Sequence, residues 1–170
     1  DEFSMIAFSS AIEPLRAANR ANKGNLYEWK ILSLNGDPVC SSNGIFIDPN
    51  DSLDENLKTD ILFVCSGLNV MSKVDRSLLG TLRKLARRGI QLGSLCTASY
   101  LLAKAGLLTN RKTTIHWENS LSMKEEFPEL EVTNNLFEID RDRYSCSGGT
   151  SSLDLMLNII IENHGSNLAK

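Results

Sequence analysis

One cysteine stands where the sequence changes from a strand pattern to a helix pattern. In "GIQLGSLCTASYLLAKAGLL", residues 89–108, an apolar run ends at Cys96 and a helical pattern follows. A residue on a sharp strand-to-helix turn is lifted out of the sheet, and the new helix points free N–H groups at it. This setting lowers the pKa of a thiol and supplies oxyanion donors. Cys96 is therefore a candidate nucleophile, and a buried thiol at a strand end is the competing interpretation.

A nucleophilic cysteine needs a base or an orienting acid nearby. The chain has two histidines, His116 and His164. His164 lies near the end of the last predicted helix, and we expect it at the surface. His116 ends a predicted strand and could approach Cys96 across the sheet. The next two residues, Trp117 and Glu118, could wall and polarise a ligand site.

Three predicted strands end in polar or small residues. In open α/β sheets the ligand crevice lies beyond the carboxyl ends of the strands, so these ends are expected to meet. Trp117 would suit a cationic ligand by cation–π attraction, although ordinary core packing explains a tryptophan equally well. No His, Cys and Asp cluster has the spacing of metal ligands, so we expect no metal. The predicted ligand-binding residues are Ser66, Gly67, Cys96, Thr97, His116, Trp117 and Glu118.

The elements that must position these residues alternate between strands and helices. Several strands are apolar on both faces, which indicates a parallel sheet covered by helices on both sides. Asn43-Gly44 is typical of a hairpin turn, and Ser4 and Asp75 are expected to cap helices. Helices are predicted at 4–22, 75–88, 97–106, 118–127 and 150–164, and strands at 27–34, 60–67, 90–96, 112–117, 129–133, 136–140 and 143–148.

Composition limits the class of protein. The 170 residues fit one domain, 1–170, and 42% hydrophobic with 23% charged residues is the profile of a soluble globular protein. The net charge of −3 gives no electrostatic footprint for nucleic acid, and the basic residues of the helix at 75–88 are expected to be a solvated face. No apolar run approaches the ~20 residues of a membrane span. The four cysteines form no CxxC pair, which favours a reduced, cytoplasmic protein.

Several segments in order resemble a known family. They are "FSMIAFSSAIEPLRAANR", "LYEWKILSLNGDPVCSSNG", "DILFVCSGLNV", "LARRGIQLGSLCTASYLLAKAGLL", "TTIHWEN" and "FEIDRDRYSCSGGTSSLDLML". Together they resemble the N-terminal domain of GlxA-type transcriptional regulators of the AraC family, which is similar to class I glutamine amidotransferases and the ThiJ/PfpI superfamily. The resemblance implies a flavodoxin-like three-layer α/β sandwich, with a mostly parallel sheet and a cysteine-bearing nucleophile elbow. It also implies a homodimer joined to a C-terminal helix-turn-helix domain that binds DNA.

Two departures from the resembling enzymes bear on catalysis. Active ThiJ/PfpI enzymes carry an acidic residue aimed at the elbow cysteine, and the equivalent position here is Ala7. The elbow also has Thr97 after the cysteine, where many members have histidine. Glu13 is the nearby carboxylate, and we expect it to be structural. These departures predict that the protein is not an enzyme and that Cys96 and His116 are vestiges of a catalytic pair.

The favoured function is therefore a ligand-sensing and dimerisation domain that needs no cofactor. The resemblance implies a small-molecule effector, a quaternary amine (betaine, carnitine) or an amino acid, bound near Cys96. A first strand before residue 4 and the DNA-binding domain are expected to lie outside this sequence, and no membrane contact is expected. The alternative is a hydrolase or hydratase with Cys96 as nucleophile and His116 as base, and with backbone N–H groups near Gly67 and Thr97 as oxyanion hole.

Overall fold

A four-stranded sheet forms the centre of the protein. The computed structural model describes residues 2–170. The strands are β5 (Ile61–Ser66), β6 (Gln91–Cys96), β10 (Arg143–Cys146) and β9 (Phe137–Asp140), in the order β5-β6-β10-β9. β5, β6 and β10 run parallel, whereas β9 is antiparallel to β10, its hairpin partner. The predicted mostly parallel sheet is confirmed.

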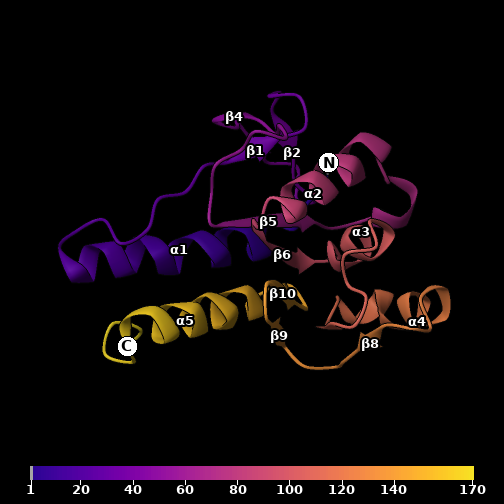
Figure 1. The fold of residues 1–170 in the computed structure, drawn as a ribbon. Helices are drawn as coiled ribbons and strands as arrows, with labels where there is room; N and C mark the ends of the chain where they lie inside the picture. The colour runs from indigo at the N-terminus through magenta and orange to yellow at the C-terminus, as the bar shows by residue number, and fades with distance from the viewer. Residues whose placement is uncertain (1) are drawn as a thin grey trace.

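Helices cover both faces of this sheet, as predicted. α1 and α5 lie side by side and share one buried cluster with the sheet, whereas α2, α3 and α4 contribute to the other cluster (Figure 1). Side chains of β6 divide between the two layers, with Leu92 in the α2/α3 cluster and Leu95 in the α1/α5 cluster. None of the helices within residues 2–170 is long and apolar enough to cross a membrane. The helices are α1 (Met5–Asn22), α2 (Arg76–Arg87), α3 (Ser99–Lys104), α4 (Trp117–Glu126) and α5 (Ser151–His164), with a short 3-10 turn at Val70–Ser72.

Three pairs of two-residue strands complete the fold. The antiparallel pair closes around Asn43-Gly44, and Gly44 has the positive φ of 85° that such a turn needs. The predicted hairpin is therefore confirmed. The pairs are β1 (Leu32–Ser33) parallel to β4 (Asp51–Ser52), β2 (Val39–Cys40) antiparallel to β3 (Phe46–Ile47), and β7 (Lys112–Thr113) parallel to β8 (Glu131–Val132).

Two helices begin where the capping residues predict. The side chain of Ser4 accepts a hydrogen bond from the N–H of Ala7 at 3.4 Å. Asp75 Oδ1 accepts from the N–H groups of Ser77 and Leu78 at 2.7 and 2.9 Å. Each cap satisfies backbone donors that the first helical turn leaves without partners. The Ser4 cap matters for the site, because it fixes the start of α1 beside the ends of β5 and β6.

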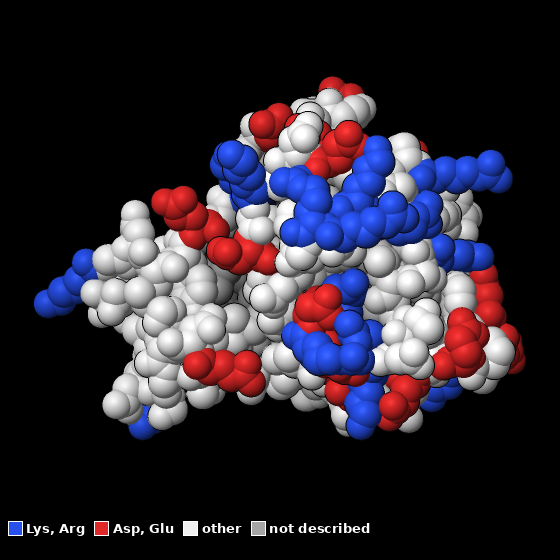
Figure 2. Space-filling model, viewed as in Figure 1, with Lys and Arg blue, Asp and Glu red and all other residues white. Residues whose placement is uncertain are grey.

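The basic face of α2 lies at the surface. Figure 2 shows Lys and Arg side chains gathered over α2, and the last turn carries Lys84 and Arg87. Lys84 pairs with Glu55, and the guanidinium of Arg88 donates to the Glu55 carbonyl. The expectation of a solvated helix face is met, since these side chains are exposed and part of their charge is used within the protein.

The strand predicted at 27–34 is wrong in extent. Only Leu32–Ser33 pairs as a strand. Asn19 of α1 explains part of the difference, because its Oδ1 accepts from the N–H groups of Leu26 and Tyr27, both at 2.9 Å. Backbone donors bound by a side chain are not available to a ladder. The apolar residues of this segment therefore line the cavity beside β5 and do not form a long strand.

The strand predicted at 112–117 is likewise too long, since β7 ends at Thr113. The next N–H, that of Thr114, donates to Ser145 Oγ at 2.9 Å. The N–H of His116 donates to the Cys96 carbonyl at 3.1 Å, and α4 begins one residue later. The segment therefore leaves its ladder to bind β10 and then the end of β6, which brings His116 to the cysteine.

A chain of buried hydroxyl groups fastens α3 to the strands beneath it. Ser94 Oγ and Ser99 Oγ lie 2.7 Å apart, and Ser99 Oγ donates to the Thr114 carbonyl at 2.6 Å. Ser94 Oγ also lies 3.3 Å from the Tyr144 carbonyl. Ser94 and Ser99 are completely buried. These contacts join β6, α3, β10 and the segment that carries His116, so they hold the surroundings of Cys96 in place.

Replacing Ser99 by alanine removes the central hydroxyl of this chain. We expect Ser99→Ala to lower the free energy of unfolding by about 1–3 kcal/mol, because a buried acceptor loses its partner. Urea denaturation measures the change. Ser42→Ala is the matched control, since Ser42 is exposed and is expected to change stability by less than about 0.5 kcal/mol. Equal stability of the two variants would show that the buried hydroxyl chain does not stabilise the fold.

Candidate functional site

Cys96 occupies a strained backbone position at the end of β6. Its φ is +63°, in the left-handed region, and α3 begins three residues later at Ser99. A non-glycine residue in this region is uncommon and persists only where its surroundings hold it. Here the ladder pairs Cys96 with Ser66 of β5, and the N–H of His116 binds the Cys96 carbonyl. The predicted nucleophile elbow is therefore present.

Gly148, at the end of β10, packs directly against the cysteine. A Cβ added to Gly148 would lie 2.9 Å from Sγ and from Cβ of Cys96, and the φ of Gly148 is +92°. Both the space and the backbone conformation require glycine here. Gly148 was not among the predicted ligand-binding residues. The double glycine at 148–149, where the predicted strand 143–148 ends, was the available signal, because such glycines mark close approach of the backbone.

The thiol of Cys96 lies in a buried setting. It is 6% exposed, and burial raises its pKa to about 11. Interactions with the backbone of Thr97 and the side chain of Ser4 lower the pKa, but by less than burial raises it. Because this pKa lies far above 7, Cys96 is a neutral thiol at neutral pH, whereas the strong nucleophile is the thiolate. Ser4 is a second neighbour that the sequence analysis missed.

No acidic side chain of α1 approaches the cysteine. Ala7 is completely buried and belongs to the same apolar cluster as Cys96. The only acidic residue of this helix, Glu13, is exposed and forms an ion pair with Arg16 at 2.6 Å. The structure therefore places a methyl group, not a carboxylate, in the cluster around the thiol, and Glu13 has the structural role expected of it.

His116 lies beside Cys96 through its backbone. Its side chain is 27% exposed, and its Nδ1 lies 3.7 Å from Glu118 Oε2. Among the described residues, the groups that bond to the Cys96 thiol are the backbone of Thr97 and the side chain of Ser4. The backbone bond to Cys96 explains why the two residues lie together although 20 positions separate them.

Ser66, Gly67 and Thr97 form one hydrogen-bonded unit at the ends of β5 and β6. Thr97 Oγ1 donates to the Gly67 carbonyl at 2.8 Å, and Ser66 Oγ lies 2.7 Å from Thr97 Oγ1. The two hydroxyls therefore satisfy each other and the carbonyl without a ligand. They also tie the carboxyl ends of β5 and β6 together, and these strand ends were predicted to meet at one edge of the sheet.

The side chains of Trp117 and Glu118 are exposed to solvent beside the elbow. Trp117 is 75% exposed, so the alternative of core packing is excluded within this chain. Its ring lies 5.8 Å from that of His116, centroid to centroid. Glu118 follows it in the first turn of α4, also exposed. An exposed aromatic ring and an exposed carboxylate thus follow one another at the start of α4, each beside His116.

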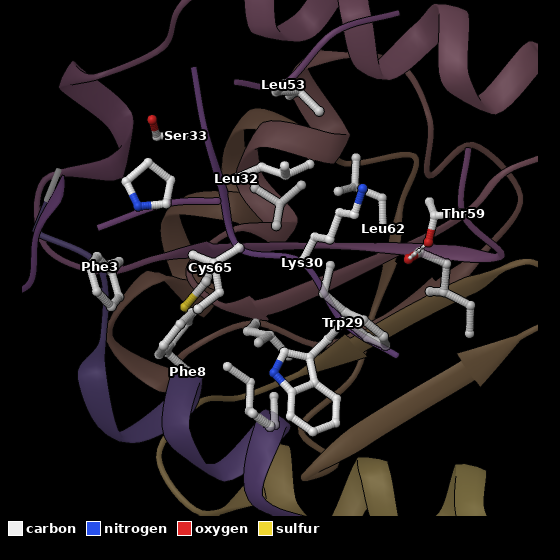
Figure 3. Close-up of a pocket in the computed structure, with 18 of the residues that line it drawn as sticks. Phe3, Phe8, Trp29, Lys30, Leu32, Ser33, Leu53, Thr59, Leu62 and Cys65 are labelled. Carbon is white, nitrogen blue, oxygen red and sulfur yellow. Dashed lines mark hydrogen bonds between the residues drawn. The ribbon is translucent and has the colours of Figure 1, made fainter. Parts of the chain in front are cut away.

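A large cavity lies elsewhere in the molecule. It has a volume of about 1910 Å³ and borders the outer edge of β5 (Figure 3). Of the predicted ligand-binding residues only Ser66 lines it, and Cys96, His116 and Trp117 do not. No three His, Cys, Asp or Glu side chains of the described residues converge as metal ligands. The elbow and this cavity are therefore separate sites, and Ser66 at the end of β5 contributes to both.

Two curated relatives of this chain are regulators of transcription. HTH-type transcriptional regulator CdhR of Pseudomonas aeruginosa is 46% identical over 98% of this chain and 49% of its own length. HTH-type transcriptional regulator GlxA of Rhizobium meliloti is 38% identical over 99% of this chain and 52% of its own. The chain thus spans about half the length of these curated relatives.

A solved structure and a family profile agree with this comparison. The crystal structure of an AraC family transcriptional regulator from Pseudomonas putida superposes with a TM-score of 0.88 at 31% identity, covering 99% of this chain and 91% of that chain. The sequence profile of the DJ-1/PfpI family matches residues 3–162. The strained cysteine elbow, the parallel sheet and these matches lead to one conclusion: the chain belongs to the DJ-1/PfpI family.

Proposed function

We propose that this chain is the ligand-sensing and dimerisation domain of a transcriptional regulator, and that it binds a small metabolite near Cys96 without catalysis. The observation that carries the proposal is that the cysteine of the elbow has a thiol with a raised pKa. Cys96 keeps its strained φ of +63°, yet burial raises the pKa of its thiol to about 11. The regulators that the chain resembles over half their length supply the biological setting.

The exposed groups of α4 favour a cationic ligand, either a quaternary amine or an amino acid. A trimethylammonium group has no N–H to donate, so it is bound by aromatic faces and carboxylates. Trp117 offers an exposed ring, and Glu118 a carboxylate in the next position. Attraction to the ring contributes about 0.5–2 kcal/mol, depending on how much water is excluded.

Binding would act on transcription through the arrangement of two copies of the protein. A ligand shifts a conformational equilibrium only by its difference in affinity for the two states. Large exposed apolar side chains at the β2–β3 hairpin, Ile45 and Phe46, support association of two copies. A part of the regulator outside this chain would make the contact with DNA. The regulator would act in the cytoplasm, where the four free cysteines of this chain stay reduced.

The alternative function is a Cys-dependent hydrolase or hydratase. The strained elbow favours it, because the backbone conformation of Cys96 is that of a presented nucleophile. In this reaction His116 would accept the thiol proton as Cys96 Sγ bonds to an electrophilic carbon that is multiply bonded to oxygen or nitrogen, and the π electron pair would move to that heteroatom. Water would then displace Sγ and release the product, and the proton would return from His116 to the thiol. The buried, neutral thiol and the alanine at position 7 oppose it. Ligand binding and thiol reactivity therefore separate the two functions.

Betaine is the first ligand to test. At a hundredfold excess over its Kd, we expect it to raise the melting temperature by roughly 5–10 °C, with a saturable dependence on concentration. Trp117→Ala should abolish the rise, because the aromatic face is lost. Differential scanning fluorimetry measures both. Carnitine and an uncharged analogue of the same size show whether the positive charge is required.

The second tryptophan provides the matched control. Trp29 lines the large cavity beside β5 and not the elbow. Trp29→Ala should leave the betaine-induced rise unchanged. A rise that survives Trp117→Ala and disappears in Trp29→Ala would place the ligand in the cavity and refute binding at α4.

Alkylation by iodoacetamide tests the enzyme alternative. With a pKa of about 11, Cys96 has roughly 300-fold less thiolate at neutral pH than free cysteine. We therefore expect Cys96 to be labelled far more slowly than free cysteine, at a rate that rises with pH up to about 11. Peptide mapping by mass spectrometry measures the rate at each cysteine, and half-buried Cys40 serves as internal reference. Labelling of Cys96 that is faster than free cysteine below pH 8 would favour the enzyme.

A further inference from the structure

The positive charges of the protein are concentrated in one stretch of its sequence. Residues 76–117 hold eight Lys or Arg residues and no Asp or Glu, although the net charge of the whole chain is −3. This stretch begins with α2 and ends at the first residue of α4. The excess of acidic residues therefore lies in the remainder of the chain, and the protein has a marked asymmetry of charge.

Half of these basic side chains are used within the protein. Lys104, Arg111 and Lys112 each form an ion pair with an acidic side chain from a later part of the chain. Lys84 of α2 pairs with Glu55. Four of the eight basic side chains thus have their charge balanced by an acid of the same chain.

Three arginines of α2 have no such partner. Among the described residues, Arg76, Arg83 and Arg87 form neither an ion pair nor a side-chain hydrogen bond, whereas Lys84 and Arg88 of the same face contact Glu55. Helix positions seven and four residues apart lie on one face, so these three side chains form a row along α2. The row is about 16 Å long, and it lies within the band of Lys and Arg that Figure 2 shows over α2.

A glycine lies in the middle of this arginine row. Gly80 is four residues after Arg76 and three before Arg83, so it lies on the same face of α2. A Cβ added to Gly80 would meet no atom within 4 Å, so packing within this chain does not require glycine. Glycine inside a helix is destabilising relative to alanine, and such a glycine usually has a packing or functional reason. The helix backbone is thus bare between the arginines, and a partner can approach it closely there.

The side chains of this face fit a phosphate backbone better than another protein or a lipid surface. α2 lies wholly within the described residues, and none of its large hydrophobic side chains is exposed. Protein interfaces have a core of aromatic and apolar side chains, and helices that lie on membranes insert an apolar face. Contacts with phosphates need neither, and the arginine guanidinium binds phosphate through two parallel hydrogen bonds.

We propose that the arginine row of Arg76, Arg83 and Arg87 binds the phosphate backbone of DNA, with Gly80 at the point of closest approach. This inference rests on the proposed function, because a regulator of transcription is held beside DNA. In the free chain the row is solvated, and on DNA it forms a contact additional to the one made outside this chain. The contact is independent of base sequence, because the phosphates are the same at every base pair.

The test measures binding of chain 1–170 to a fluorescein-labelled DNA duplex by fluorescence anisotropy, in about 20 to 200 mM KCl. Each phosphate contact releases a counterion, so a plot of log association constant against log salt concentration should have a slope of roughly −3. Duplexes rich in A·T and in G·C should bind within about twofold of each other, because phosphates carry no sequence information. Absence of binding at the lowest salt concentration would overturn the proposal.

Two double variants separate the arginine row from the net charge of the chain. Arg83→Gln with Arg87→Gln should weaken binding about tenfold or more at the lowest salt concentration and reduce the slope to about −1. Arg20→Gln with Lys124→Gln is the matched control, since it removes the same charge from exposed positions of α1 and α4. The control should keep a slope of about −3. Equal losses in the two variants would show that binding follows net charge, which contradicts the proposal.

Gly80→Gln tests the close approach without a change in charge. Glutamine is the better helix former, so the variant should have a higher melting temperature than the wild type. Its side chain should hold the phosphates away from the helix backbone and weaken DNA binding by about threefold or more. A higher melting temperature with unchanged DNA affinity would refute the placement of DNA on this row.

Other partners would give different results. If the row binds an acidic face of a second copy, sedimentation of chain 1–170 at low salt without DNA will show self-association that Arg83→Gln with Arg87→Gln abolishes. If it binds an anionic membrane, vesicles of phosphatidylglycerol and phosphatidylcholine will bind the chain more tightly than the duplex does. Either result would overturn the assignment to DNA.

Failure of this inference can be distinguished from failure of the proposed function. A chain that betaine stabilises but that does not bind the duplex would refute the DNA contact of α2 and leave ligand sensing in place. A chain that binds the duplex through the arginine row, but whose melting temperature does not respond to betaine, would refute betaine binding at α4 and support the contact with DNA.

Discussion

The left-handed backbone of Cys96 is the constraint on which the site depends. A non-glycine residue at φ +63° is held at a cost of about 1–2 kcal/mol, and neighbours from three other segments hold it. β5 pairs with it at Ser66, the N–H of His116 binds its carbonyl, and Gly148 leaves no space on the third side. Each of these neighbours is itself fixed by the parallel sheet. The geometry of the elbow is therefore a property of the fold, and it does not require that the cysteine react.

The packing around the elbow sets both the backbone geometry of Cys96 and the burial of its thiol. The packing that holds Cys96 also removes water from its thiol, and the loss of hydration favours the neutral form. In an enzyme an adjacent base or acid offsets that effect. Here Ala7 adds only apolar surface, and the imidazole of His116 has Glu118 Oε2 at 3.7 Å from its Nδ1. A fold of this kind supports several functions, and the function follows from the groups placed at the elbow. At the start of α4 this chain has an exposed tryptophan and an exposed glutamate beside the elbow.

The open edge of β5 extends the same reasoning to the other side of the strand. The sheet reaches the elbow through β5 and β6, and among the described strands β5 pairs with β6 alone. Across the cavity, the buried hydroxyls of Tyr27 and Ser33 have no hydrogen-bond partner among the described residues. The segment around them was predicted as a long strand because of its apolar pattern. Its pattern suits a sheet neighbour, but only Leu32 and Ser33 have a described strand to pair with, at β4.

Local signals in the sequence determined where elements begin and where the elbow lies. Ser4 and Asp75 cap helices because their short side chains reach backbone donors two or three residues away, and Cys96 stands where strand periodicity gives way to helix periodicity. Only the tertiary structure decided the pKa of the thiol, the contact with Gly148 and the exposure of Trp117. The physical reason is the separation along the sequence of the residues that each interaction joins. Capping and periodicity act within one turn, whereas burial and close approach depend on residues that are distant in the sequence and meet only in the folded chain.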